Sequence, residues 1–372
     1  MLYIRQLHLT QFRNYQDQHL EFSPGINCIS GPNGSGKTNI LDALHYLSFT
    51  RGFRSSQDKH AVQEDTHFFF NKATLVKAWQ EIEVQCNYIK GKGKKVLINQ
   101  QPLKKMSEHI GSIPLVAILP HDTGLIGGPS GLRRKFMDML ISQYDHTYLL
   151  QLIQYERILA QRNALLRLFA ERGGGDADEI ALWDMQLIPA GRYIVEQRQL
   201  FLQDFFPLFQ HYFKRIISER EEPAIRYKSQ LTENTEAAWQ QLLAERLPKD
   251  RVMLYTTAGV HRDDLSFHIN DQSVRNFGSQ GQQKTFVIAL KLAQYQLLQQ
   301  RIELAPILLL DDIFDKLDEY RLQSIGRILE EEIEGQVFVT DTSTQRLKKV
   351  FQQANKDKLA FFEVVYGRVN AI

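Results

Sequence analysis

The most constraining feature of this sequence is a glycine-rich loop between an apolar strand and a helix. A strand is predicted at Ile26–Ser30 and a helix from Asn39 onward. The segment between them fits the pattern G-x-x-x-x-G-K-[ST], the phosphate loop of nucleotide-binding proteins, in its required strand–loop–helix setting. Its residues are Gly31, Pro32, Asn33, Gly34, Ser35, Gly36, Lys37 and Thr38. A chance glycine-rich turn is the alternative, but both flanks agree with a nucleotide site in an α/β fold.

The residue types of the loop indicate its ligand. Glycines let backbone N–H groups turn toward phosphates, and the N-terminus of the following helix adds a partial positive charge. Lys37 is expected to reach the β- and γ-phosphates, and the Thr38 hydroxyl is expected to bind Mg²⁺. The predicted ligand is a nucleoside triphosphate with magnesium.

Two carboxylates end a second apolar strand, Ile307–Leu310. Beside a phosphate loop, Asp311 would hold the metal through water, and Asp312 would orient or deprotonate the attacking water. Taken alone the pair is a weak signal, because buried strands often end in acidic residues. It becomes a predicted catalytic site only together with Lys37.

A long insertion separates the two halves of this site. Lys37 and Asp311 lie much farther apart than one βαβ unit of about 30 residues requires. Strand signals dominate residues 1–125, helical periodicity dominates residues 126–250, and strands alternate with helices in residues 251–372. We therefore predict a lobe with the phosphate loop and β-rich hairpins, an inserted helical arm, and a second lobe, with a mainly parallel sheet.

Several local expectations accompany this division. Pro189 and Pro207 are expected to end or kink helices of the arm, because proline breaks the helical hydrogen-bond ladder. A strand is expected at residues 252–257, and Trp79 is expected in the core.

A second anion-binding pattern precedes a helix in the last third of the chain. A serine with neighbouring glycines at a helix N-terminus offers a hydroxyl, free N–H groups and a helix dipole to an anion. Because Lys37 already serves the local phosphates, this pattern better suits a nucleotide on another subunit. The residues concerned are Ser279, Gln280, Gly281, Gln282 and Gln283.

Two further groups of residues are candidates for phosphate contacts. Arg13 follows the first strand and could reach a nucleotide phosphate, although a surface arginine is an equal alternative. Four lysines at an expected hairpin tip suit sequence-independent contact with DNA phosphates, although a solvated turn is the alternative. These lysines are Lys90, Lys92, Lys94 and Lys95.

Composition limits the remaining classes of protein. The formal net charge is only +2, so any contact with nucleic acid must be local, and basic residues are in excess only in residues 1–125. Cys28 and Cys86 show no metal-type spacing and are expected to be buried thiols. No stretch reaches the roughly 18 apolar residues of a spanning helix, so we expect a cytoplasmic protein without a membrane partner.

These features together resemble the ABC-type ATPase heads of the SMC class, and within it the RecF family of bacterial recombination mediators. The resemblance covers nearly the whole chain, and the arm is its least diagnostic part. One departure concerns Thr340-Asp341, which stand after a strand where many transporter-type ABC ATPases have a histidine. The segments that carry the resemblance are 12–15, 31–38, 48–54, 128–130 with 133–138, 259–265, 279–283, and 311–312 with 315–318.

The resemblance implies a P-loop ABC-type (SMC-like) ATPase head with an inserted helical arm subdomain. It further implies ATP and Mg²⁺ as cofactors, and weak, DNA-stimulated ATP hydrolysis that acts as a switch. The partners implied are a second copy of the chain, which contributes its signature in trans, double-stranded and gapped DNA, and RecR, with RecO and RecA in the same pathway. A nucleoid-associated place in the cytoplasm follows.

Two other classes remain as alternatives at this point. A transporter-type ABC ATPase subunit would need a membrane partner, and the long arm argues against it. An SMC-like, ATP-gated DNA nuclease would need acidic metal ligands beyond Asp311 and Asp312, for which the sequence offers no additional domain.

Overall fold

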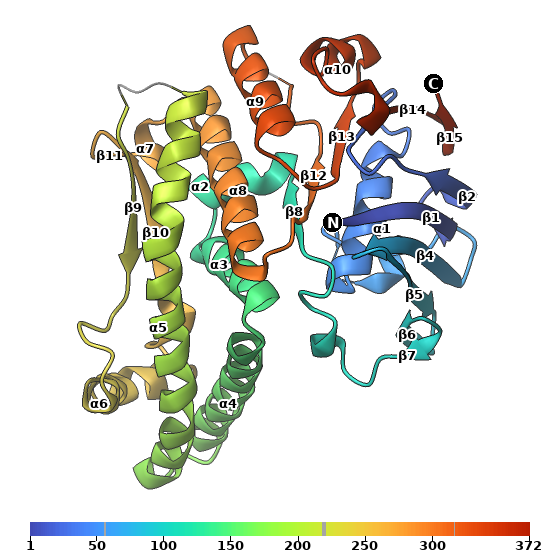
Figure 1. The fold of residues 1–372 in the computed structure, drawn as a ribbon. Helices are drawn as coiled ribbons and strands as arrows, with labels where there is room; N and C mark the ends of the chain where they lie inside the picture. The colour runs from blue at the N-terminus through green and yellow to red at the C-terminus, as the bar shows by residue number, and fades with distance from the viewer. Residues whose placement is uncertain (56, 218–220, 316) are drawn as a thin grey trace. The chain divides into compact units, whose positions relative to one another are not determined.

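The computed structural model describes residues 1–55, 57–217, 221–315 and 317–372 (Figure 1). The chain divides into two compact units. The first unit consists of Met1–Asp122, Tyr212–Ser218 and Lys284–Ile372, and the second of Thr123–His211 and Glu219–Gln283. The three-segment division at residues 125 and 250 stays a prediction, and in the structure residues 251–283 cluster with most of the expected arm. Lys316, in the motif after Asp312, lies outside the described residues.

The first unit contains the mainly parallel sheet that the alternation of strands and helices predicts. Its strand order is β15-β14-β3-β13-β12-β8, and only the β14–β15 pair is antiparallel. All residues of its central strands are buried, as expected for strands covered on both faces. The strands are β3 (Ile26–Ser30), β8 (Leu115–Ile118), β12 (Ile307–Leu310), β13 (Val337–Asp341), β14 (Leu359–Val365) and β15 (Arg368–Ala371).

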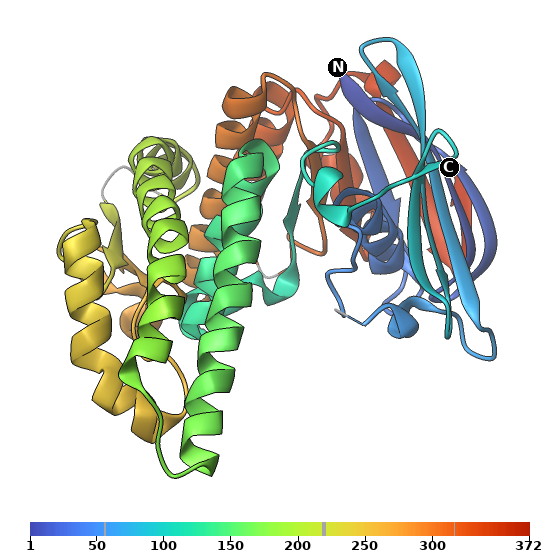
Figure 2. The ribbon, with the colours of Figure 1, turned by 90° about the horizontal axis from the view of Figure 1, so that it is seen from below.

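A second, antiparallel sheet of the first unit has the order β2-β1-β4-β5-β6-β7. Figure 2 shows its strands, coloured from dark blue to teal, side by side. Helix α1 (Lys37–Phe49) contacts strands of both sheets and so holds the phosphate loop between them. The strands are β1 (Leu2–Phe12), β2 (Tyr15–Glu21), β4 (Phe68–Lys77), β5 (Gln80–Ile89), β6 (Gly93–Ile98) and β7 (Gln101–Pro102).

The expectation that Trp79 is a core residue is wrong. Ala78 and Trp79 form the turn between β4 and β5, both with positive φ (49° and 70°), and the Trp79 side chain is 97% exposed. Alternation along a strand predicts a buried face only where the strand continues, and here the chain reverses.

Helices α8 (Gln280–Ile302), α9 (Glu319–Glu331) and α10 (Thr344–Val350) complete most of the helical structure of the first unit. α8 begins in the second unit and ends in the first. No described helix is both long and apolar enough to cross a membrane. Cys28 and Cys86 are buried free thiols, as predicted.

The second unit is mainly helical. Helices α4 and α5 form a hairpin, joined across the pair by a hydrogen bond of 2.6 Å from Arg162 Nε to Asp184 Oδ1 (Figure 1). The 40-residue helix α5 continues through Pro189 and Pro207, so neither proline ends it. The helices are α2 (Gly124–Gly127), α3 (Ser130–Tyr144), α4 (His146–Glu171), α5 (Ala177–Ile216), α6 (Glu236–Met253) and α7 (Val274–Phe277).

A small antiparallel sheet of order β11-β10-β9 lies in the same unit. β9 (Pro223–Lys228) is a strand within the region that helical periodicity dominates, and β10 (Asp264–Ile269) and β11 (Gln272–Ser273) follow. The strand expected at residues 252–257 is wrong, because α6 extends to Met253.

Candidate nucleotide site

The phosphate loop and the aspartate pair lie at one edge of the parallel sheet. β13 lies between β3 and β12, so the carboxyl ends of these three strands are neighbours. The Thr38 hydroxyl donates a hydrogen bond of 2.9 Å to Asp311 Oδ1. The structure therefore brings together the two predicted magnesium ligands, although they are remote in sequence. In doubly wound α/β folds, ligands bind at this edge of the sheet.

At two positions of the loop, the backbone conformation and the neighbouring atoms require glycine. Gly31 has φ +147°, and a Cβ atom there would lie 2.3 Å from the Val364 carbonyl oxygen. Gly36 has φ +121°, and a Cβ atom would lie 2.6 Å from Asn14 Nδ2. Positive φ together with such contacts excludes other residues without a local shift.

The Lys37 ammonium and the Ser35 hydroxyl are buried polar groups of the phosphate loop. Lys37 is only 4% exposed, and its ammonium donates to the carbonyl oxygens of Gly31 (2.8 Å) and Pro32 (3.1 Å). The buried Ser35 hydroxyl has no hydrogen-bond partner among the described residues. Buried polar atoms are normally paired, so an unpaired hydroxyl in a phosphate loop fits a phosphate oxygen as its partner. The residues present thus suit a nucleoside triphosphate.

Residues from the first hairpin hold the loop in place. Tyr15 OH donates to the Gly36 carbonyl (3.0 Å), and Asn14 Nδ2 donates to the Ser35 carbonyl (2.9 Å). Burial raises the pKa of the Tyr15 phenol well above its ordinary value, so it remains a donor. Tyr15 is fully buried, so it is a fixed support of the loop.

Arg13 is engaged elsewhere in this structure. Its Nη2 and Nε donate to Asp42 Oδ2 at 2.7 and 3.1 Å, and its Nη1 donates to the His60 carbonyl at 2.6 Å. The Asp42 side chain is fully buried, so this pair fixes α1 against the first hairpin. A phosphate contact by Arg13 stays a prediction.

Thr340 at the end of β13 is a residue whose role the sequence left open. Its hydroxyl donates to Asp311 Oδ1 (2.8 Å) and accepts from the Asp312 backbone N–H (3.0 Å), so it orients the Asp311 carboxylate and fixes the backbone of Asp312. The only sequence signal was the position of Thr340 at the end of a strand where related ATPases have a polar switch residue.

Asp312 differs electrostatically from Asp311. Burial raises the pKa of the Asp312 carboxyl, and Asp311, Asp341 and Asp315 raise it further, whereas Lys37 lowers it. Its φ of 45° is left-handed, which is uncommon for a non-glycine residue. A carboxylate with a raised pKa in a nucleotide site suits proton transfer from water.

The serine of the predicted signature caps α8. Ser279 Oγ accepts from the Gln282 N–H (3.2 Å), and Gln282 Oε1 accepts from the Ser279 N–H (3.0 Å), which is a reciprocal capping box. Gln283 Nε2 donates to the Gly278 carbonyl (3.0 Å). These residues therefore form a helix N-terminus at which Ser279 and Gln280 are exposed. Contact with an anion stays a prediction for the whole signature, which consists of Ser279, Gln280, Gly281, Gln282 and Gln283.

The lysine hairpin joins β5 and β6. Lys90, Lys92 and Lys95 are exposed, and their ammonium groups make no hydrogen bond or ion pair with other described residues. Lys94 differs, because its ammonium donates to Asp58 Oδ1 at 3.0 Å and is partly buried. Three of the four predicted DNA-contacting lysines are therefore available to an external phosphate, and Lys94 is paired within the chain.

The chain is similar to RecF proteins over nearly its whole length. The family described as the RecF/RecN/SMC N terminal domain matches residues 3–360. DNA replication and repair protein RecF of Flavobacterium johnsoniae is 40% identical over 355 residues, which are 95% of this chain and 98% of that protein. The corresponding protein of Parabacteroides distasonis is 40% identical over 366 residues, which are 98% of each chain.

Solved structures agree with the sequence relatives. The structure of the recombination mediator protein RecF with ATP, from the RecFOR pathway, is 30% identical and superposes with a TM-score of 0.88 over 100% of this chain and 98% of that chain. An Smc head domain from Pyrococcus furiosus, 16% identical, superposes with a TM-score of 0.57 over 100% of this chain and 96% of that chain, and shares the fold.

Proposed function

The chain belongs to the RecF family of DNA replication and repair proteins, a family of SMC-like, ABC-type ATP-binding proteins, and from this premise we propose that ATP assembles it into a DNA-gripping homodimer. The observation that carries the proposal is the shared hydrogen-bond network of Thr38, Asp311 and Thr340 beside a phosphate loop with an unpaired buried Ser35 hydroxyl. Membership of the RecF family also favours this interpretation of the sequence over a transporter subunit or a nuclease.

Binding of ATP follows from the residues of the loop. The Lys37 ammonium would exchange the carbonyl oxygens of Gly31 and Pro32 for phosphate oxygens, and Ser35 would gain its missing partner. Thr38 directly and Asp311 through water would hold Mg²⁺, which neutralises charge on the phosphates when bound. Thr340 keeps the Asp311 carboxylate oriented for this role.

Hydrolysis would require a base for the attacking water. Asp312 combines a raised pKa with a backbone position fixed by the bond from its N–H to Thr340. In its ionised form it can orient the water and accept its proton. We expect weak hydrolysis that acts as a switch, because the gain lies in releasing the dimer rather than in turnover.

The signature would complete the site from a second copy. Ser279 is exposed at the N-terminus of a long helix, where its hydroxyl and the helix dipole favour an anion. Contacts that exist only with a γ-phosphate make dimerisation depend on ATP, since a ligand shifts an equilibrium by its differential affinity.

The proposed partners follow from the family. We infer that the dimer binds double-stranded and gapped DNA near single-strand/double-strand junctions through Lys90, Lys92 and Lys95, and that it helps RecO and RecR to load RecA. The exposed lysines support the DNA part of this inference, because each phosphate contact releases counterions.

Sizing in solution with and without ATP tests the proposal. The wild-type chain should become dimeric with ATP and Mg²⁺, Lys37→Ala should lose ATP binding, and Asp312→Asn should stay dimeric. Ser279→Arg should bind ATP but remain monomeric, whereas Gln240→Arg, an exposed helix position outside the signature, should dimerise. ATP-dependent dimers of Ser279→Arg would refute the signature in trans.

A further inference from the structure

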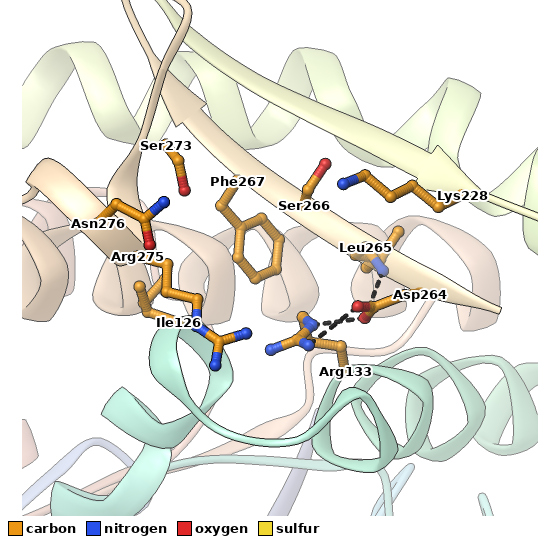
Figure 3. A pocket seen from close by; sticks show the side chains of 10 residues that line it. All are labelled: Ile126, Arg133, Lys228, Asp264, Leu265, Ser266, Phe267, Ser273, Arg275 and Asn276. Carbon is orange, nitrogen blue, oxygen red and sulfur yellow. Dashed lines mark hydrogen bonds and ion pairs between the residues drawn. The ribbon is translucent and has the colours of Figure 1, made fainter. Parts of the chain in front are cut away.

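A hollow of about 400 Å³ in the second unit has a strongly basic lining (Figure 3). It is bounded by α2, α3, α7 and the small antiparallel sheet, and none of its residues belongs to the nucleotide site described above. Arg133, Lys228 and Arg275 are its cationic residues, and Asp264 is its only acidic one. The lining thus has more positive than negative charge.

One wall is built from two sequence motifs that the proposed ATP switch does not use. Arg133, from the segment 133–138, donates through Nε and Nη2 to Asp264 Oδ1 (2.6 Å) and Oδ2 (3.0 Å), from the segment 259–265. Arg133 Nη1 donates to the carbonyl oxygens of Leu125 and Gly128, both at 2.9 Å. Arg133 therefore uses four of its N–H donors within the chain and is held in place, and it pairs with the one carboxylate of the hollow.

The other two cations have no partner among the described residues. Arg275 and Lys228 are exposed, and their side chains make no hydrogen bond or ion pair with the residues that the structure describes. Figure 3 shows the guanidinium group of Arg275 directed toward that of Arg133, with Lys228 extending along the same hollow near Ser266. Like charges that face one another repel, and the repulsion falls when an anion lies between them.

The neutral polar groups of the hollow favour the same kind of ligand. Asn276 and Ser273 offer N–H and O–H donors without a partner among the described residues, and Figure 3 shows both side chains near Arg275. Arginine presents its N–H groups in a planar fork that matches the oxygens of a phosphate, and lysine adds a mobile point charge.

We propose that this hollow binds a phosphate group, with Arg275 and Lys228 as its charged ligands and Asn276 and Ser273 as neutral donors. The phosphate can belong to a DNA backbone or to a free phosphate-bearing molecule. In the first case the inference rests on the DNA binding proposed above, and in the second it stands without it.

Binding of a free phosphate is tested in the Lys37→Ala chain, so that the phosphate loop does not take up the probe. Inorganic pyrophosphate is titrated calorimetrically into this chain and into the same chain carrying Lys228→Gln and Arg275→Gln. Arg226→Gln is the matched control, because Arg226 lies on the same strand β9 but pairs with Asp271 at 2.6 Å and does not line the hollow. We expect at least tenfold weaker binding in the double variant and none of this loss in the control.

Binding of a DNA phosphate is tested in the chain that keeps Lys37, because Lys37→Ala is expected to lose ATP. This chain, with and without Lys228→Gln and Arg275→Gln, is titrated with a gapped duplex in the presence of ATP at about 50 and 200 mM salt. Two lost phosphate contacts should reduce the slope of log affinity against log salt by about 2. A loss in only the DNA titration identifies a DNA phosphodiester, and a loss in only the pyrophosphate titration identifies a free ligand. Unchanged behaviour of the double variant in both titrations overturns the proposal. If the parent chain does not bind DNA, the function proposed above fails, and the pyrophosphate titration alone decides on the hollow.

Discussion

Replacing Thr340 by valine is the sharpest perturbation of the nucleotide site. The side chain is fully buried, and valine has nearly the same shape with a methyl group in place of the hydroxyl, so the change acts mainly through the lost hydrogen bonds. The change removes the hydrogen bond of 2.8 Å to Asp311 and the one of 3.0 Å from the Asp312 N–H. The Asp311 carboxylate and the Asp312 backbone N–H thereby each lose a fixed partner.

The magnitude follows from these two hydrogen bonds. A hydrogen bond to a charged group contributes about 1.5–3 kcal/mol, and a buried donor left without a partner costs about 1–3 kcal/mol. Asp311 keeps the 2.9 Å bond from Thr38, so part of the loss is recovered. We expect the free energy of unfolding to fall by about 2–4 kcal/mol. Loss of an outer partner of a metal ligand should weaken Mg²⁺ binding by about 10–100-fold.

Two measurements check this reasoning. Urea unfolding gives the change in stability, and titration of Mg²⁺ into the ATP-bound chain gives the change in metal affinity. Thr340→Ser is the control, because it keeps the hydroxyl and loses one methyl group, for a cost of about 1 kcal/mol and no loss of metal affinity. The argument is refuted if Thr340→Val matches Thr340→Ser in both measurements.

Two further predictions concern protonation and DNA contacts. Burial lowers the pKa of His261 to about 4 from its ordinary value of 6.5, so the unfolded chain binds more protons between these values and stability should fall by about 3 kcal/mol as pH drops through that window. Chemical unfolding at several pH values measures this loss, and an equal loss in His261→Gln would contradict it. Lys92→Gln and Lys95→Gln should each reduce the salt slope of DNA binding by about 1, whereas Lys94→Gln, already paired with Asp58, should leave it close to wild type. Equal effects at all three positions would show that pairing within the chain does not matter.

The part of the nucleotide site that lies in one short segment of the sequence was predictable. Residues 31–38 carry the strand end, the glycines, the lysine and the threonine in one segment, so local chemistry determines the ligand class. The meeting of Thr38 with Asp311 could be inferred as well, because a nucleotide site requires both. The bonds of Thr340 could not, since within β13 it looks like one more β-branched residue of a buried strand, and only the strand order places it beside Asp311.

Which charged residues form ion pairs could not be predicted from the sequence, for a related reason. Lys92, Lys94 and Lys95 are chemically identical and almost adjacent, yet only Lys94 meets Asp58. Successive side chains of a strand point to opposite faces, so the identity of the opposing loop decides which lysine is paired. The basic hollow is another example, because Arg133, Lys228 and Arg275 come from three separate elements.

The continuity of α5 shows how burial can override a strong local signal. A proline inside a helix costs about 3 kcal/mol, so Pro189 and Pro207 together oppose the helix by about 6 kcal/mol. Three phenylalanines of the same helix, Phe201, Phe205 and Phe209, are at most 1% exposed. Burying three such side chains stabilises by roughly 5–9 kcal/mol, which is enough to offset both prolines. Because this gain depends on what the helix packs against, the proline rule alone could not show that both residues lie inside one continuous helix rather than at a helix end.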